Sequence, residues 1–375
     1  VAEDDMGENL PPFNYTWDAR VKQVSAGQTQ TCAIFRDDSL GCWGRRWNPE
    51  EQISGGRRRE LGEGSARSDD YVPIVYPQLQ AKAKDVAVGD AHTCATLTDN
   101  TLKCWGWNAY GQLGQGDTVY RGIMSSDVGA GLSSIDLNLG SSQAAIGEIK
   151  YVAKQLSAGY AHTCAVFEDN ALKCWGWNYD GQLGYGDKNN RGDEPDEMGS
   201  NLPEVDVGSK VKVTYVAVGY YHTCALLSDA SLKCWGANNY GQLGQGDTIN
   251  RGTLKDQMGD SLPPVDFGGR RVKQVSAGFG HTCVILDDDS VKCFGLNDRG
   301  QLGLGDSKGR GDLPTDMGNE IPVVELMADR SESEREIIIP KGAPASAAAN
   351  PFRLGCVRTF LSTAAPMIFA CYLLI

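Results

Sequence analysis

The fold of this chain is decided by the stretch His162-Thr163-Cys164-Ala165-Val166-Phe167-Glu168-Asp169-Asn170-Ala171-Leu172-Lys173-Cys174-Trp175-Gly176, continued by Gly181-Gln182-Leu183-Gly184 and Asp187. The stretch occurs five times with small changes, and the first cysteines of the copies are Cys32, Cys94, Cys164, Cys224 and Cys283. The copies are about 60 residues apart, a period that suits one propeller blade and is too long for a helical-hairpin repeat. Residues shared by every copy are expected to maintain the repeated unit.

The third copy shows how the strands of one unit arise. Residues 162–167 alternate between two faces, residues 168–170 form a polar three-residue turn, and residues 172–176 return as the next strand. A short strand over residues 154–159 precedes this hairpin, and a weaker fourth strand is expected over residues 202–206, which include a proline. No segment of the repeats shows the apolar periodicity of an α-helix over the length that a helix needs. The sequence therefore predicts an all-β propeller of four-stranded blades.

The pattern Ala-Gly-x-x-His-Thr-Cys-Ala, then Cys-Trp-Gly-x-Asn-x-x-Gly-Gln-Leu-Gly-x-Gly-Asp, resembles the regulator-of-chromosome-condensation-type repeat. The resemblance covers about residues 20–326. It implies a β-propeller, usually of seven blades, whereas five repeat units are recognisable in this chain. Residues 6–11 match residues 198–203 of a later repeat. Residues 1–19 are therefore expected to be a partial repeat or a closing strand, with missing upstream blades as the alternative.

Ten of the twelve cysteines form five pairs, each with nine residues between the partners. The tight turn places the partners opposite each other, and opposed Cα atoms about 4.5–5.5 Å apart are within reach of a disulfide. One disulfide per unit is predicted; free buried thiols, or zinc bound by His162, Cys164 and Cys174, are the alternatives. Zinc is disfavoured because Gln30 replaces the histidine in the first unit, whose cysteine pair persists. The predicted pairs are Cys32/Cys42, Cys94/Cys104, Cys164/Cys174, Cys224/Cys234 and Cys283/Cys293.

Five disulfides indicate an oxidising compartment, and hence an extracellular or cell-surface protein. There, Asn14 of Asn14-Tyr15-Thr16 would be a glycosylation site. The apolar C-terminal residues 360–375 add the expectation of a membrane anchor. The repeats are expected to end near residue 330; residues 331–350 are expected to be a charged, then small-residue linker, and residues 351–375 a hydrophobic anchor or signal. Ser346, Ala347 and Ala348 before the apolar end resemble a glycolipid-attachment signal. A transmembrane anchor, or a tail that packs on the propeller, is the alternative.

The composition and the repeat positions argue against several kinds of function. A net charge of −13 disfavours nucleic acid as the main partner. All four histidines, His92, His162, His222 and His281, occupy one repeat position, so they are expected to be hydrogen-bonding groups of the fold. Asp117, Asp187, Asp247 and Asp306 are expected to form turns. No catalytic residue, cofactor or metal is predicted.

Two Arg-Gly-Asp tripeptides, at residues 191–193 and 310–312, could suggest integrin binding. Both occupy the repeat position that holds Arg-Gly-Ile at residues 121–123 and Arg-Gly-Thr at residues 251–253. A structural Arg-Gly turn is therefore the favoured explanation. The first unit also carries Arg57-Arg58-Arg59 in an inserted loop, which is expected to belong to an atypical terminal repeat, with a basic partner-binding loop as the alternative.

Residues that vary between the copies are the best candidates for recognition, because a binding face must differ from one blade to the next. The candidates are aromatic side chains expected on one rim of the propeller, and the alternative is that they cover neighbouring blades. They are Trp107, Tyr160, Trp177, Tyr220, Tyr221 and Phe279.

The sequence thus favours a non-enzymatic cell-surface or secreted propeller that binds a protein or glycan. The family that the repeat resembles includes secreted enzyme inhibitors and receptor-kinase ectodomains, which implies the same class of function. An intracellular guanine-nucleotide-exchange or signalling regulator with reduced cysteines is the main alternative. A secreted enzyme with a loop site is the least favoured.

Overall fold

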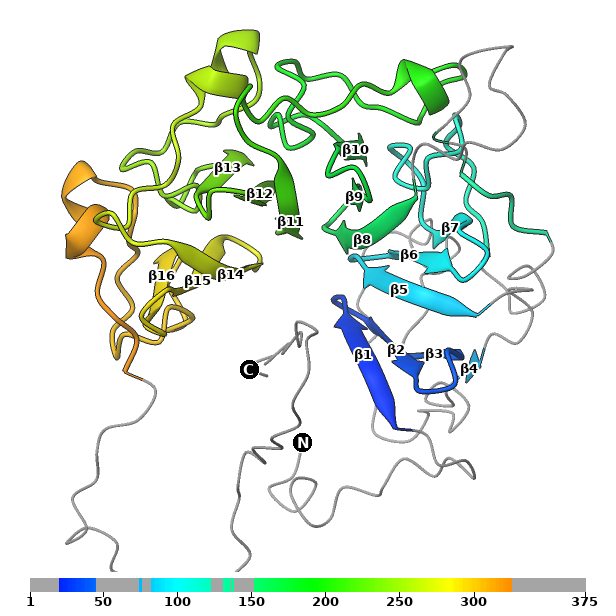
Figure 1. Cartoon of the computed structure of the whole chain (residues 1–375), viewed down its shortest axis with the longest axis horizontal. Helices are drawn as coiled ribbons and strands as arrows, with labels where there is room; N and C mark the ends of the chain where they lie inside the picture. Colours follow the sequence, from blue (N-terminus) through cyan, green and yellow to red (C-terminus); the bar gives the residue numbers. More distant parts are fainter. Residues whose placement is uncertain are drawn as a thin grey trace, which may run out of the picture. The chain divides into compact units, whose positions relative to one another are not determined.

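The computed structural model describes residues 20–44, 74–75, 82–122, 131–135, 137 and 152–325. These residues form five antiparallel sheets, one for each repeat unit, as predicted (Figure 1). The first two sheets contain β1 (Val21–Ala26), β2 (Gln30–Phe35), β3 (Leu40–Gly44), β4 (Ile74–Val75), β5 (Ala83–Val88), β6 (His92–Leu97) and β7 (Leu102–Gly106). The other three contain β8 (Ala153–Ala158), β9 (His162–Phe167), β10 (Leu172–Gly176), β11 (Val213–Val218), β12 (His222–Leu227), β13 (Leu232–Gly236), β14 (Val272–Ala277), β15 (His281–Leu286) and β16 (Val291–Gly295).

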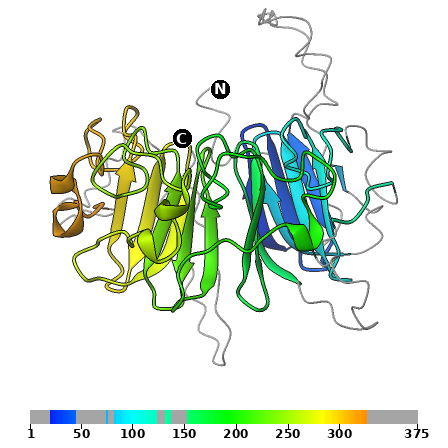
Figure 2. The ribbon, with the colours of Figure 1, turned by 90° about the horizontal axis from the view of Figure 1, so that it is seen from above.

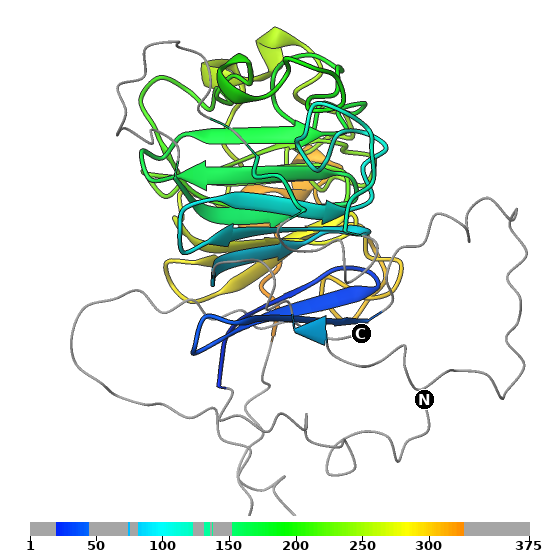
Figure 3. The same cartoon turned by 90° about the vertical axis from the view of Figure 1, so that its right-hand side faces the viewer.

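Successive sheets pack against each other in the order of the chain. The first strand of each sheet contacts the first strand of the next, from β1 to β5, β8, β11 and β14, and these strands face the centre in Figure 1. Figure 3 shows the blue sheet of β1–β4 beside the cyan sheet of β5–β7 and the green sheet of β8–β10. This is the arrangement of propeller blades, and it confirms the predicted fold class.

The hydrophobic core lies between neighbouring blades. One buried cluster combines Val166 and Leu172 of the third blade with Val216 and Trp235 of the fourth. A single blade could not bury both of its faces, so each blade depends on the next for its stability.

The predicted fourth strand is much reduced. The sheets of the second to fifth blades have three strands each, and a fourth strand, β4, occurs only in the first sheet of the described residues. In the third blade, residues 202–206 make one backbone hydrogen bond to β10, from the Val205 N–H to the Leu172 carbonyl at 2.8 Å. The fourth strand, predicted to be weaker than the other three, is thus reduced here to this single contact with β10. Pro203 lacks the N–H group that a longer ladder would need.

Short 3-10 turns follow the third strands: η6 (Gly199–Asn201), η7 (Lys255–Gln257), η8 (Gly259–Ser261), η9 (Pro314–Asp316) and η10 (Gly318–Glu320). Within the described ranges, no helix has the length and hydropathy to cross a membrane.

The strands run side by side, so the loops gather at two opposite ends of the blades (Figure 2). In an antiparallel meander the end of the first strand, the start of the second and the end of the third share one end of the sheet. This end is called the rim below. It brings the loop at residues 159–161, between β8 and β9, next to the residues that follow β10.

Candidate functional site

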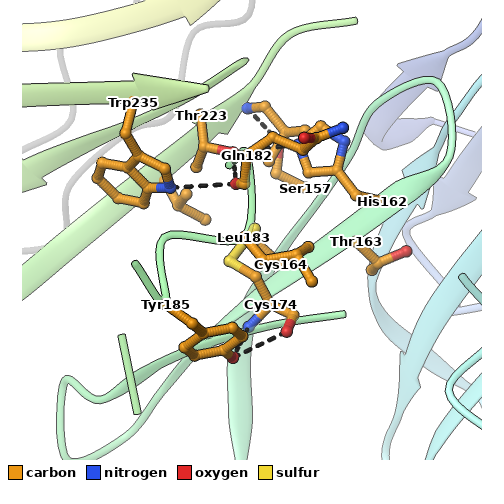
Figure 4. The surroundings of a disulfide bond; sticks show 12 residues. Ser157, His162, Thr163, Cys164, Cys174, Gln182, Leu183, Tyr185, Thr223 and Trp235 are labelled. Carbon is orange, nitrogen blue, oxygen red and sulfur yellow. Dashed lines mark hydrogen bonds between the residues drawn. A yellow bond between two sulfur atoms is a disulfide. The ribbon is translucent and has the colours of Figure 1, made fainter. Parts of the chain in front are cut away.

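A disulfide closes each of the five hairpins, as predicted. The bonds join Cys32–Cys42, Cys94–Cys104, Cys164–Cys174, Cys224–Cys234 and Cys283–Cys293. In the third blade Cys164 and Cys174 are directly opposed in the ladder, with Cα atoms 4.1 Å apart. Because the two sulfurs bond each other, they are not available to zinc. The hydroxyl of Tyr185 donates to the carbonyl of Cys174 at 2.8 Å and accepts its N–H at 3.0 Å (Figure 4).

The repeated histidine joins each blade to the next. His162 Nε2 lies 3.1 Å from Thr223 Oγ1 of the following blade. The Thr223 hydroxyl donates its proton to the Gln182 carbonyl at 2.8 Å, which also accepts the Trp235 indole N–H at 3.0 Å (Figure 4). Since that proton is already used, His162 must be protonated on Nε2 and donate to Thr223. His92 and His222 make the same contact, with Thr163 and Thr282 at 2.9 Å.

These histidines are neutral parts of the fold. Burial lowers the pKa of His92 to about 4 and the pKa of His162 and His222 to about 3. Gly159 leaves room for the ring, because a Cβ there would meet His162 Cε1 at 2.8 Å and the Gly219 carbonyl oxygen at 2.2 Å. The prediction that the histidines are hydrogen-bonding groups of the fold is confirmed for these three.

Gln30 takes over this role in the first blade. Its Oε1 accepts a hydrogen bond from the Thr93 hydroxyl at 3.0 Å, so the direction of donation is reversed while the link to the second blade is kept. The sequence showed that the histidine was missing but not what the glutamine does, because its partner lies 63 residues away.

Asp85 is a buried carboxyl group between the first and third blades. Its two oxygens accept from Gln23 Nε2 and from the Leu156 N–H, each at 2.5 Å. Desolvation raises the pKa of Asp85 to about 6, against the lowering effect of these hydrogen bonds. Its hydrogen bonds on both sides therefore serve to join the blades.

The Gly-x-Gly-Asp turns are held by an ion pair within the turn. Asp187 accepts the N–H of Asn189 at 2.9 Å and pairs with Arg191 at 2.7 Å. Asp117–Arg121, Asp247–Arg251 and Asp306–Arg310 repeat the ion pair at 2.6–2.7 Å. The turn-forming role of the aspartates is thus confirmed. The arginine of each Arg-Gly-Asp tripeptide is held by its own turn, which supports the structural explanation over integrin binding.

The six aromatic side chains predicted to meet a partner lie together on the rim. Tyr160 stacks on Tyr220 with ring centroids 4.6 Å apart, and Tyr220 lies 4.7 Å from Phe279. Trp107 and Trp177 each meet Tyr160 edge-on, at 5.4 and 5.8 Å. The rings therefore form a continuous surface over the second to fifth blades. We call this set the rim cluster: Trp107, Tyr160, Trp177, Tyr220, Tyr221 and Phe279.

Two further tyrosines extend the rim cluster and were missed. Tyr110 and Tyr179 stack on Trp177 with centroids 5.4 and 6.4 Å apart. Both occupy variable positions inside the constant Asn-x-x-Gly turn, which was the signal that could have found them. Exposure differs along the surface: Tyr179 is 63% exposed and Phe279 52%, whereas Trp107 is 8% exposed. Trp107 therefore packs beneath its neighbours, while the others offer ring surface to solvent.

The surface beside Trp177 is hollowed to a volume of about 690 Å³. Tyr179, Lys188, Asp193 and Glu197 contribute to its lining. One Glu197 oxygen accepts three backbone N–H groups, at residues 192–194, and the Lys188 ammonium lies 5.3 Å from the centroid of the Tyr179 ring. The hollow thus combines aromatic surface with both signs of charge.

Several predicted features fall outside the described residues. They are the glycosylation site at Asn14, the lipid-attachment residues Ser346, Ala347 and Ala348, the basic loop at residues 57–59, and the segments 1–19 and 331–375. These stay predictions.

Comparison with known families identifies the repeat. Two models, both described as the regulator of chromosome condensation (RCC1) repeat, match the chain. One matches residues 83–112, 153–182, 213–242 and 272–301, and the other matches residues 171–226 and 232–285.

Among curated relatives, the ultraviolet-B receptor UVR8 of Arabidopsis thaliana is 29% identical over 296 residues, which cover 78% of this chain and 56% of the receptor. The X-linked retinitis pigmentosa GTPase regulator homolog of Caenorhabditis elegans is 24% identical over 306 residues, covering 77% of this chain and 19% of that protein. The chain thus spans about half the length of the first relative and much less of the second.

Solved structures agree on the fold. Prp20p from Saccharomyces cerevisiae, whose structure was described with its binding to Gsp1p and histones, has a TM-score of 0.56 at 20% identity, over 83% of this chain and 64% of that one. Human WBSCR16 has a TM-score of 0.54 at 20% identity, over 84% of this chain and 69% of that one.

Proposed function

Because this chain belongs to the regulator of chromosome condensation repeat family, we propose that it is a non-enzymatic propeller, secreted or held at the cell surface, that binds a protein partner through the rim cluster. The observation that carries this proposal is the continuous aromatic surface formed by residues that vary between otherwise constant repeats. Packed aromatic side chains that are partly exposed are typical of the energetically dominant residues of protein interfaces.

The relatives support a binding or regulatory role. The names of two of them describe a receptor and a GTPase regulator homolog, and Prp20p binds Gsp1p and histones. Nucleic acid is a poor candidate for this chain because its net charge is −13.

The five disulfides support an oxidising location, outside the cytosol. We also propose membrane attachment through the apolar segment at residues 360–375. Mass spectrometry without reduction, on protein isolated from its own cells, should yield peptides linked within each repeat unit. Ten free thiols at these positions would instead favour the intracellular regulator.

The rim cluster is tested with Tyr220→Ala combined with Tyr221→Ala. Partner binding is expected to weaken by at least about 30-fold, because even one central aromatic residue of an interface contributes about 2 kcal/mol or more. The melting temperature should fall only modestly, because both rings are partly exposed on the rim and lie outside the buried clusters between the blades. Surface plasmon resonance on captured partner and scanning calorimetry provide the two readouts.

Tyr215→Ala is the matched control, because it removes a 37%-exposed tyrosine from the body of β11 and away from the rim. Binding that survives the double substitution would refute the rim as the interface, and a large fall in melting temperature would show that the rings mainly cover neighbouring blades. A glycan on the partner is the second candidate ligand, favoured by the hollow beside Trp177. In that case, enzymatic deglycosylation of the partner should abolish the binding.

A further inference from the structure

Asp90 is an acidic residue at a repeat position that is aromatic in the next three blades. It follows Gly89 in the loop between β5 and β6, where the next three blades have Tyr160, Tyr220 and Phe279. Its backbone N–H donates to the Gly159 carbonyl at 3.1 Å, which fixes the loop against the third blade. Its carboxyl oxygen Oδ1 is buried and has no hydrogen-bond partner. A desolvated carboxylate oxygen without a donor is unfavourable and is a feature that needs an explanation.

Asp90 lies next to the loop that carries Tyr160, because its N–H bonds the Gly159 carbonyl. Burial is the main cause of the raised pKa of the hydroxyls of Tyr160, Tyr220 and Tyr221, and the negative charge of Asp90 adds to it. Burial also raises the pKa of Asp90 itself, and no basic side chain in the described part of the chain offsets its charge. An uncompensated negative group therefore acts on the tyrosines of the rim cluster.

A second carboxylate on the rim is already partnered. Asp180, which also acts on Tyr221, accepts from Asn250 Nδ2 at 3.0 Å, and Lys188 counteracts its charge. Asp90 is thus the rim carboxylate whose hydrogen-bonding capacity remains open.

A carboxylate without a basic partner, on a rim of aromatic side chains, suits a cation. Arginine fits better than lysine, because its planar guanidinium stacks on aromatic rings, is weakly hydrated and donates paired hydrogen bonds to a carboxylate. The net charge of −13 further favours a basic partner. We infer that Asp90 and the tyrosines around it bind an arginine side chain presented by the protein partner. This inference rests on the proposed function and names the chemistry of that interface.

Asp90→Asn tests the inference with a nearly isosteric change. Fluorescein-labelled peptides of four arginines, four lysines or four citrullines are titrated into the full chain and followed by fluorescence anisotropy. The arginine peptide is expected to bind at least 10-fold more tightly than the citrulline peptide, and Asp90→Asn to remove about 10-fold of that affinity, because hydrogen bonds to charged groups contribute about 1.5–3 kcal/mol. Asp256→Asn, on the exposed turn η7, makes the same change in net charge and should leave binding unchanged.

Equal binding of the arginine and citrulline peptides, or equal binding by wild type and Asp90→Asn, would overturn the inference. Lysine peptides that bind as tightly as arginine peptides would overturn the assignment to arginine. Partner binding that is lost in the double tyrosine variant but kept in Asp90→Asn would refute the arginine site while leaving the rim interface intact. Asp90→Asn should not lower the melting temperature, because it removes an uncompensated charge. A loss of binding in this variant would therefore not be caused by misfolding.

Discussion

Reduction of the five disulfides is expected to unfold the propeller. Each bond joins cysteines 10 positions apart and closes a separate small loop. The chain-entropy relation assigns roughly 2.7 kcal/mol to a loop of this size. The loops do not overlap, so their contributions sum to roughly 13 kcal/mol, which is comparable with the entire net stability of about 5–15 kcal/mol of a typical folded protein.

The measurement compares urea unfolding of the oxidised protein with that of protein reduced and alkylated under denaturing conditions, then returned to buffer. Denaturant is needed during reduction because cysteines such as Cys164 and Cys174 are fully buried. Near-ultraviolet circular dichroism should show no fixed tertiary structure in the reduced protein. Cys164→Ala with Cys174→Ala serves as the single-bond control and should lower the free energy of unfolding by about 2–3 kcal/mol. A reduced protein that unfolds at the same urea concentration as the oxidised one would contradict the expectation.

This result also bears on function. If the reduced chain does not fold, the cytosol cannot host it, and the intracellular exchange-factor alternative is lost together with its reduced cysteines. If the reduced chain folds normally, the bonds are incidental to the fold and the proposed extracellular location loses its main support.

The sequence was sufficient for features that depend on short separations along the chain. The hairpin register followed from a three-residue turn that places Cys164 opposite Cys174, and the structure has this register. The sequence predicted a weaker fourth strand over residues 202–206, and in the structure it is reduced to one backbone hydrogen bond to β10. An extended conformation and a paired strand look alike in sequence, whereas only the latter needs N–H donors at alternate residues, and Pro203, two residues before Val205, has none.

Features that depend on distant contacts were not predictable in the same way. The aromatic residues of the rim were found as a set because they break the repeat pattern, but their stacking across blades, such as that of Tyr160 on Tyr220, needed the structure. Asp90 breaks the same pattern, yet a single aspartate in a loop carries no signal of its own. Its significance comes from a buried oxygen without a donor, and burial is a property of the assembled blades.

Acidification from pH 7 to pH 5 is expected to lower the free energy of unfolding by several kcal/mol, through the histidines that join the blades. The folded-state pKa values of His92, His162 and His222 are about 4, 3 and 3, below the ordinary value of 6.5. The unfolded chain therefore binds protons first, and the stability present above pH 6.5 is lost as the pH falls toward the folded-state values. pH 5 lies about 1.5 units below the pKa of a histidine in the unfolded chain. Protonation therefore stabilises the unfolded state by about 2 kcal/mol for each histidine and about 6 kcal/mol for the three.

Asp85 opposes this loss. Its folded-state pKa is raised to about 6, so its contribution is present at low pH and disappears as the pH rises through 6. As the pH falls from 7 to 5, protonation of Asp85 should raise the free energy of unfolding by only about 1 kcal/mol. The histidines therefore determine the direction of the change.

The triple variant His92→Gln, His162→Gln and His222→Gln separates the histidines from all other titrating groups. Gln30 already occupies this repeat position in the first blade and links to Thr93 at 3.0 Å, so glutamine is compatible with the blade junction. Urea unfolding at pH 7 and pH 5 should show that the variant loses about 6 kcal/mol less stability than wild type, because carboxyl groups titrate equally in both proteins and cancel in the difference. An equal loss in the two proteins would mean that the buried imidazoles accept a proton on Nδ1 without loss of stability, which would contradict the lowered pKa values of His92, His162 and His222.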